Sequence, residues 1–462
     1  MTFAQEGIWL HEEQSRNSSA YSIFNVVRII GEFDVAVFER SLSEVIVRHE
    51  ILRTNFRLIN GEPTQIIRSP APIRVAVHDI SDLVTTKKEE VFRSLADVEA
   101  KRRFDLENEL LFRVTVLRSE SDRHVLLVNV HHLVCDGWSL GLLTAEIMTI
   151  YEEMANGRPT SVAELPIQYG DYAAWQRSNI ADEVMLREIP YWKAKLKGAS
   201  PLLGLPTDRP RPSVRSFSGS RVEFRVDPKQ VNELRGFCRR HRVSVFVAML
   251  AAFASVLHRH TGNESILVGS PIANRPVREV RHLVGLFIDL VPFRIDFFDD
   301  PTGVDLLERV RSTTLEVLDH QLPSFERLVT GLGISRDPSH SPLFQVVFAM
   351  QPADILPAVE GLQLEVSPVG SDGAKFDLTV FTVEERDGGM LCIFEYATDL
   401  FEAATIERLS GHFGMLLEGI VAAPDARIGE LALLSEAERE RLVVEWNATR
   451  ADYPAEKCLH EL

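Results

Sequence analysis

The chain has 462 residues, 45% of them hydrophobic and 25% charged, which is enough for two hydrophobic cores in a globular protein of ordinary composition. Its formal net charge of −17 argues against nucleic acid or an anionic membrane surface as its main partner, because both would repel it. No apolar run is long enough to span a membrane, and the four cysteines form no CxxC pair, so we expect a cytoplasmic protein with reduced thiols.

The first elements in the chain are a strand and an amphipathic helix. Residues 24–30 are mostly apolar and predict a strand. Asp34 predicts the N-cap of a helix whose apolar residues share one face: Val37, Phe38, Leu42, Val45 and Ile46. At the end of this helix, His49 and Glu50 could be mistaken for an acid–base pair. Because arginines flank them, we expect a structural ion cluster there instead.

Two histidines end the next buried strand. Residues 124–130 form an apolar run rich in β-branched residues, and His131 and His132 follow it directly. Ser139 then predicts the N-cap of a helix that ends before Gly157. Strand alternation sends the two imidazoles to opposite faces, so at most one of them can face a given pocket.

The turn between this strand and helix carries an aspartate and a glycine. A neutral imidazole at a strand end can accept a proton near neutral pH. Asp136 cannot easily reach the same ring, because the chain turns between them, but it can pair with an arginine elsewhere and fix the turn. Gly137 allows close backbone approach. The alternative is that one histidine is core, the other is surface, and Asp136 only caps a turn. We expect no metal, because no histidine or cysteine cluster has zinc spacing.

The second half of the chain repeats the order of strand, capping aspartate and helix. The proline-rich residues 205–212 predict an extended connector near a lobe boundary. Residues 221–226 predict a strand, and Asp227 with Pro228 predicts the start of a helix. Residues 244–260 are apolar nearly all round and predict a central buried helix. The chain ends with a charge-laced amphipathic helix at residues 434–442.

Residues 131–139 resemble the HHxxxDG core of condensation domains from nonribosomal peptide synthetases, which share a superfamily with chloramphenicol acetyltransferase-like enzymes. Six further patterns are similar and come in the family's order. Residues 2–10 resemble SxAQxRLW with Gly7 in place of arginine, 47–56 resemble RHExLRTxF, and 169–175 resemble YxDYAxW. Residues 284–289 resemble IGxFVN with Asp289 in place of asparagine, 320–326 keep the ends of HQDYPFE, and 336–345 resemble RDxSxNPLFQ with Ser341 in place of asparagine.

The resemblance implies an α/β fold of two chloramphenicol acetyltransferase-like lobes in a V-shaped pseudodimer with a central tunnel. We expect the first lobe at residues 1–176 and the second at 177–434. Within the second, the strand at residues 376–380 would belong to a latch that bridges the lobes. Residues 435–462, with 446–449 and 453–462 as the clearest part, would be a linker toward an adenylation domain.

The resemblance also implies an acyltransfer that forms an amide. His132 would be catalytic, as proton acceptor or as the group that orients the amine, and the Gly137 N–H would face the developing oxyanion. His131, Asp136 and Arg275 would support the motif; Arg275 is expected to pair with Asp136, the alternative being a surface arginine in a loop. Trp138 and Ser139 are candidates for the substrate channel. No intrinsic cofactor is implied, because the substrates arrive as phosphopantetheine thioesters on a carrier protein or CoA.

The subtype depends on whether Met1 is the natural start. If it is, no upstream carrier precedes the first pattern, and we expect a starter domain that uses acyl-CoA; otherwise an elongation domain with a carrier-bound peptidyl donor is equally expected. Less expected are a free-standing CoA-dependent small-molecule acyltransferase, whose DFGWG sequence is missing, and a non-catalytic recruitment domain, which would have lost His132. Expected partners are downstream adenylation and peptidyl carrier domains, with no nucleic acid and no membrane, and the chain is expected to be a monomer.

Overall fold

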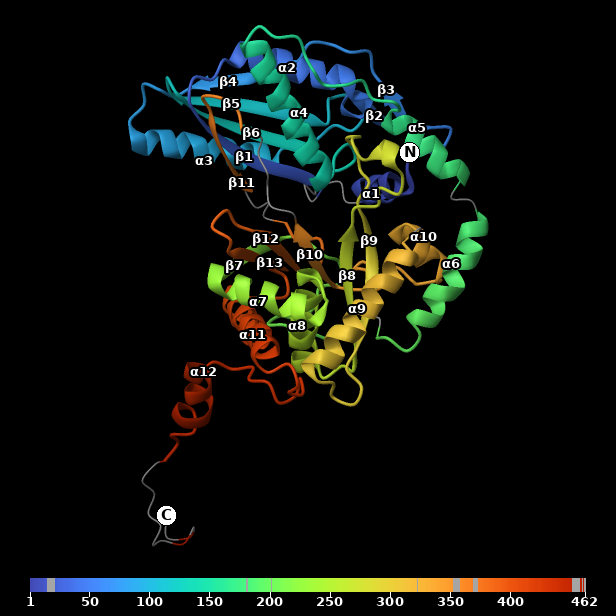
Figure 1. Cartoon of the computed structure of the whole chain (residues 1–462), viewed down its shortest axis with the longest axis vertical. Coiled ribbons are helices and arrows are strands. Elements are labelled where there is room, and N and C mark those ends of the chain that lie inside the picture. Colours follow the sequence, from blue (N-terminus) through green and yellow to red (C-terminus); the bar gives the residue numbers. More distant parts are fainter. Residues whose placement is uncertain are drawn as a thin grey trace.

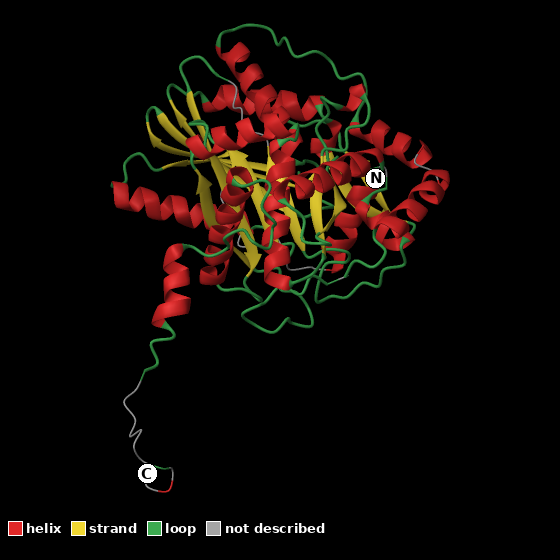
Figure 2. Ribbon diagram, turned by 60° about the horizontal axis from the view of Figure 1, so that its bottom comes forward, coloured by secondary structure: helices red, strands yellow, loops and turns green. Residues whose placement is uncertain are grey.

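The computed structural model describes residues 1–14, 21–179, 182–200, 202–321, 323–351, 358–368, 373–450, 458 and 460. Two large β-sheets dominate the structure, and each forms the centre of one lobe. Figure 1 shows the first half of the chain mainly in one lobe and the second half mainly in the other, and Figure 2 shows helices around the outside of the strands. The predicted α/β class is confirmed.

The first lobe is built on a five-stranded sheet in the order β11–β1–β6–β5–β4. Its strands are β1 (Ser22–Ile30), β4 (Ala76–Asp79), β5 (Phe112–Glu120), β6 (Arg123–His131) and β11 (Gln363–Pro368). The side chains of β6 alternate between two cores: Leu126 and Val130 belong to the core under α2 (Val35–Arg48) and α4 (Gly137–Ala155), and Leu127 belongs to the core under α3 (Thr85–Lys101). The sheet is therefore covered by helices on both faces.

The remaining elements of the first half lie around this sheet. Helix α1 (Phe3–Gln14) contacts the second lobe through α10 (Phe325–Gly331), and α5 (Tyr169–Asn179) begins with two tyrosines of the first-lobe core. The short 3₁₀ turn η1 (Glu50–Arg53) leads into a separate hairpin of β2 (Thr54–Ile59) and β3 (Glu62–Ile67). At η1 the expected ion cluster is present: Glu50 pairs with Arg53 at 3.2 Å, and Glu146 pairs with both Arg48 and His49.

The second lobe is built on a six-stranded sheet in the order β7–β13–β12–β10–β8–β9. Its strands are β7 (Gly219–Val226), β8 (Ser265–Ile272), β9 (Asp289–Asp296), β10 (Val346–Gln351), β12 (Leu378–Glu384) and β13 (Met390–Ala397). Its helices are α6 (Asp182–Lys195), α7 (Pro228–His241), α8 (Val245–Thr261), α9 (Gly303–Asp319), α10 and α11 (Ala403–Ala422). Every residue of α8 from Val247 to Leu257 is buried, which confirms the predicted central helix.

Local capping signals explain where several helices begin. Asp34 caps α2, and Asp227 caps α7 with Pro228 in the first turn, as the sequence predicts. Ser244 is the N-cap of α8. The helix predicted after the motif is present as α4, but its predicted N-cap, Ser139, was wrong. Its N-cap is Asp136, whose side chain accepts a hydrogen bond from the Ser139 N–H, so the helix begins at Gly137 and Ser139 lies within its first turn.

Two segments of the second half cross into the first lobe. Strand β11 forms the edge of the first sheet and pairs antiparallel with β1, from Asn25 opposite Pro368 to Ile30 opposite Gln363. We call residues 273–288, between β8 and β9, the crossing segment; it includes the 3₁₀ turn η2 (Arg278–Val280), and its apolar residues Val280, Leu283, Val284 and Phe287 belong to the first-lobe core. The latch prediction was therefore misplaced, because residues 378–380 lie inside the second sheet as part of β12 and β11 makes the connection.

The C-terminal part projects from the second lobe (Figure 1). The predicted charged helix is present but short, as α12 (Glu436–Glu440) with a capping box at Ser435, followed by a π-helical turn, η3 (Arg441–Glu445). Of the expected linker, residues 446–449 are described, whereas 453–457, 459, 461 and 462 lie outside the described residues. No single described helix is long and apolar enough to cross a membrane. Helices α7 and α8 together reach the length and hydropathy of a membrane span, but they meet at 104°, and α8 is buried in the core of the second lobe.

Candidate active site

The histidine-containing turn lies where the two lobes meet. Strand β6 ends at His131, a tight turn follows, and α4 begins at Gly137. In this turn the Val134 N–H donates to the His131 carbonyl at 3.0 Å and the Cys135 N–H donates to the His132 carbonyl at 3.3 Å. The sheet and the helix therefore hold the turn from both sides.

Asp136 joins this turn to the crossing segment. One carboxylate oxygen accepts the Ser139 N–H at 2.7 Å, and the other accepts the N–H groups of Phe287 and Ile288 at 2.9 and 3.0 Å. Arg275 lies 3.5 Å from the same carboxylate, and both side chains are almost fully buried. The predicted pairing of Asp136 with an arginine from the second half is confirmed.

Arg275 and Ser139 complete the junction. The Arg275 guanidinium donates to the carbonyls of Val280 and Leu283 at 2.6 and 2.8 Å and to the Ser139 hydroxyl at 2.8 Å. The Ser139 hydroxyl also donates to the Gly285 carbonyl at 2.7 Å and accepts the Gly285 N–H at 3.1 Å. Because Ser139 is fully buried, its hydroxyl is not free to line a substrate channel, and these contacts give it a structural role instead.

Aromatic residues of α5 hold the same crossing segment. The Tyr169 hydroxyl contacts the Leu286 carbonyl at 2.5 Å and the Thr2 hydroxyl at 3.1 Å, and its ring packs edge-on against Phe287. A Cβ at Gly285 would lie 2.1 Å from the Tyr169 ring, so only glycine fits at this position. Tyr169 therefore packs the first lobe against the crossing segment.

The two histidines have different surroundings, as strand alternation predicts. His131 is buried: its Nδ1 accepts the Leu133 N–H at 3.1 Å, its Nε2 lies 3.7 Å from the Glu12 carboxylate, and the Phe104 ring packs against it. These contacts fix the imidazole ring within the first lobe and support a structural role for His131.

His132 faces the second lobe. The residue is intermediate between buried and exposed. The Tyr21 ring lies edge-on with the ring centroids 6.3 Å apart, and the Tyr21 carbonyl accepts the His132 N–H at 2.8 Å. Desolvation lowers the pKa of His132 well below its usual value, and the charges of Lys375 and His131 lower it further, against a hydrogen bond with the Cys135 backbone. The imidazole is therefore neutral at pH 7.

Two neighbours of His132 had no signal in the sequence. Tyr21 lies just before β1, and Lys375 lies just before β12, more than 240 residues after His132. The Lys375 ammonium lies 4.5 Å from the centroid of the Tyr21 ring, so a side chain from each lobe meets beside His132. Only the docking of the lobes brings these residues together.

Gly137 and Trp138 lie at the open end of the turn. Gly137 is exposed, and no described atom beyond its neighbours lies within 4 Å of the position that a Cβ would take. The Gly137 N–H belongs to the first turn of α4, where helix N–H groups lack intrahelical acceptors. Trp138 is 50% exposed, and the Arg275 guanidinium lies 5.7 Å from its ring centroid. Within the described residues no group of three or more histidine, cysteine or acidic side chains is placed to hold a metal ion.

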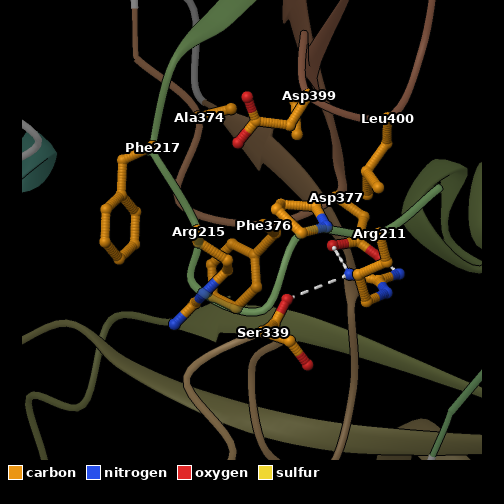
Figure 3. Close-up of a pocket in the computed structure, with 11 residues that line it drawn as sticks. Arg211, Arg215, Phe217, Ser339, Ala374, Phe376, Asp377, Asp399 and Leu400 are labelled. Carbon is orange, nitrogen blue, oxygen red and sulfur yellow. Dashed lines mark hydrogen bonds and ion pairs between the residues drawn. The ribbon is translucent and has the colours of Figure 1, made fainter. Parts of the chain in front are cut away.

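A hollow in the second lobe lies close to the same boundary (Figure 3). It is small and partly open to solvent, and Arg211 and Asp377 form an ion pair in its wall. Phe217, which also lines it, has a φ of 60° and packs edge-on against His11 of the first lobe. The hollow thus reaches the aromatic contacts that lead to Tyr21 and His132.

A family model described as condensation domain matches residues 1–443. One of the linear gramicidin synthase proteins from Brevibacillus parabrevis is 40% identical over 464 residues, which is 100% of this chain and 9% of that protein. Surfactin synthase subunit 1 from Bacillus subtilis is 32% identical over 459 residues, or 99% of this chain and 12% of that protein. The chain therefore spans about a tenth of the length of these relatives.

Solved structures share the fold over most of the chain. The X-domain from teicoplanin biosynthesis matches with a TM-score of 0.84 and 25% identity, covering 94% of this chain and 97% of that one. The starter condensation domain of rhizomide synthetase, solved with C8-CoA, matches with a TM-score of 0.81 and 20% identity, covering 94% and 97%.

Proposed function

The chain belongs to the condensation-domain family of nonribosomal peptide synthetases, and on that premise we propose that it joins an acyl donor, held as a thioester, to the amine of a carrier-bound aminoacyl acceptor. Members of this family are transferases that form amide bonds. The observation that carries the proposal is His132, a neutral imidazole that is fixed at a strand end and faces the other lobe.

The reaction assigns a step to each part of the turn. The acceptor amine attacks the thioester carbonyl, and a ring nitrogen of His132 takes the proton that the amine loses as the C–N bond forms. The oxyanion that develops can accept the Gly137 N–H, which points away from the body of α4 at its N-terminus. When the C–S bond breaks, the proton passes from His132 to the departing thiolate. A second role for His132, holding the amine in line with the carbonyl, is compatible with the same position.

The other motif residues act through the structure. His131, Asp136 and Arg275 hold the turn, and Arg275 ties it to the crossing segment. We propose Trp138 as a channel residue because it is half exposed beside the motif. We further propose lobes at residues 1–176 and 177–434, a tunnel between them that carries both substrates, and a linker from 435 toward an adenylation domain and its carrier. This assignment rests on the family pattern and on the multidomain length of the relatives.

The experiment measures amide formation by the chain with an aminoacyl group loaded on a carrier protein. His132→Ala is expected to lower the rate by about 10²–10⁴-fold, the usual contribution of a positioned general base. His78→Ala, on the exposed strand β4, is the matched control and should keep the parent rate. Full turnover by His132→Ala would contradict the proposed mechanism.

The source of the donor is decided in the same assay. We propose first a starter role, in which free acyl-CoA is the donor. The alternative is an elongation role, in which the donor is a carrier-bound aminoacyl or peptidyl group. Similarity in fold to a starter domain solved with C8-CoA supports the first, and the 40% identity to a linear gramicidin synthase is compatible with the second. Product formed from acyl-CoA alone supports the starter role, and product formed only from the carrier-bound donor supports elongation.

A further inference from the structure

Lys375 is an ionisable group beside the reaction centre that the proposed mechanism leaves without a part. It precedes β12 in the second lobe, whereas His132 and Tyr21 belong to the first. Its Nζ lies 4.5 Å from the centroid of the Tyr21 ring, and that ring packs edge-on toward His132. Lys375 thus presents a positive charge to the imidazole from across the lobe boundary.

The backbone at Lys375 is held in place from the loop before β7. The Arg215 guanidinium donates to the Lys375 carbonyl at 3.0 Å, and the N–H of Ala374 donates to the Phe217 carbonyl at 2.9 Å. An isolated bridge between Ser218 and Gly373 extends this pairing. These contacts therefore anchor the backbone around Lys375 to the loop before β7.

The ammonium group is not neutralised by a contact ion pair. No carboxylate in the described part of the chain lies within ion-pair distance of Lys375 Nζ; Glu395, whose charge acts on it, is bound to Arg221 at 2.8 Å, and Glu12 acts from α1. Desolvation lowers the pKa of Lys375 to about 8, so most of the side chain is charged at pH 7. Because burial removes this ammonium group from much of the solvent, its charge is less screened than a surface charge and acts more strongly on the groups around it.

We propose that Lys375 is a positioning residue for the condensation: from the second lobe, it places a positive charge opposite His132 and thereby sets the proton affinity of the imidazole when the lobes are docked. This inference rests on the proposed function. The charge keeps His132 free to take the proton of the attacking amine. It also favours the uncharged form of that amine, since a second ammonium close by would be repelled.

Other titratable groups surround Lys375, Tyr21 and His132, and the test leaves all of them unchanged. His131 faces His132 from β6; His11 and Glu12 come from α1, Arg215 from the loop before β7, and Glu326 from α10. Glu326 and Glu12 act on Tyr21, whose pKa is raised mainly by burial. None of these groups is changed by a substitution at position 375, so a shift in the titration of His132 reports on the lysine.

The test compares Lys375→Met, which keeps the length of the side chain, with Lys375→Arg, which keeps the charge. Two readouts are used: the pH dependence of kcat/KM for amide formation, and the NMR titration of His132 in protein with labelled histidine, assigned with His132→Gln. In Lys375→Met we expect the acid limb and the His132 titration to move up by about one pH unit, the effect of one partly screened charge at this range. In Lys375→Arg both should stay within a few tenths of the parent. Lys229→Met, on the exposed face of α7, is the lysine control.

The outcomes separate this inference from the proposed function. An unchanged His132 titration in Lys375→Met, or a shift of equal size in Lys375→Arg, overturns the inference. A chain that makes no amide but whose His132 titration shifts as expected leaves the charge coupling in place and contradicts the proposed function. If Lys375→Met does not fold, as judged by circular dichroism, Lys375→Gln takes its place with the same expected shift.

Discussion

Replacing Asp136 with alanine should destabilise the fold far more than loss of an ordinary helix cap. The substitution removes the acceptor of the Ser139 N–H at the start of α4 and the acceptor of the Phe287 and Ile288 N–H groups in the crossing segment. It also removes the counterion of Arg275. Four contacts are lost at once, and three of them bind the second half of the chain to the first.

The size of the effect follows from these contacts. Loss of a cap costs about 1 kcal/mol, and each buried N–H left without an acceptor costs about 1–3 kcal/mol. Arg275 keeps its bonds to the Val280 and Leu283 carbonyls, so its charge adds less than the roughly 3–5 kcal/mol of a broken buried pair. Because the effects overlap, we expect a total loss of about 4 kcal/mol, a large part of the roughly 5–15 kcal/mol that stabilises a typical domain.

The measurement is the free energy of unfolding in urea, followed by circular dichroism. Asp227→Ala is the matched control, because Asp227 caps α7 at the surface and, among the described residues, its side chain binds only the first turn of that helix; it should cost about 1 kcal/mol. Asp136→Asn, which keeps one acceptor oxygen but not the charge, should fall between the two. The reasoning is refuted if Asp136→Ala loses no more stability than Asp227→Ala.

Two further substitutions test the same boundary. Gly285→Ala should lower the free energy of unfolding by at least about 1–3 kcal/mol, because the added methyl group would overlap the Tyr169 ring, which its own hydrogen bonds hold in place; an unchanged urea midpoint would contradict the close approach. Burial raises the pKa of Asp289 to about 7, so the folded state binds a proton that the unfolded state releases near pH 4, and stability falls as pH rises from 4 through 7. Asp289→Asn should therefore be more stable than the parent by a few kcal/mol at pH 8 and similar at pH 4, and equal stability of the two proteins at pH 8 would argue against a buried charge.

Local signals were sufficient for much of the fold. The capping residues Asp34 and Asp227 and the apolar run of α8 each act within one element, so the sequence alone located those helices. At α4 two capping residues lie three positions apart, and the carboxylate of Asp136 prevails over the hydroxyl of Ser139, which is occupied by Gly285 and Arg275. The position of β11 could not be predicted, because alternation in a strand does not identify the sheet that it joins.

The candidate site divides in the same way. The motif resemblance located His131, His132, Asp136 and Arg275, and the pairing of the last two is present. The resemblance did not indicate that Asp136 also binds the amides of Phe287 and Ile288, nor that Tyr21 and Lys375 meet beside His132. These contacts join residues more than a hundred positions apart and arise from docking of the lobes, which no periodic pattern in the sequence encodes.

The strand that β11 adds to the first sheet has a consequence for synthesis on the ribosome. When residue 176 has emerged, β1 still has an unpaired edge, and the partner for that edge is translated roughly 190 residues later. At about 5–20 residues per second the nascent chain must protect this edge for roughly 10–40 s. A pause in translation between residues 176 and 363 would therefore lengthen the period in which neighbouring nascent chains can pair with each other.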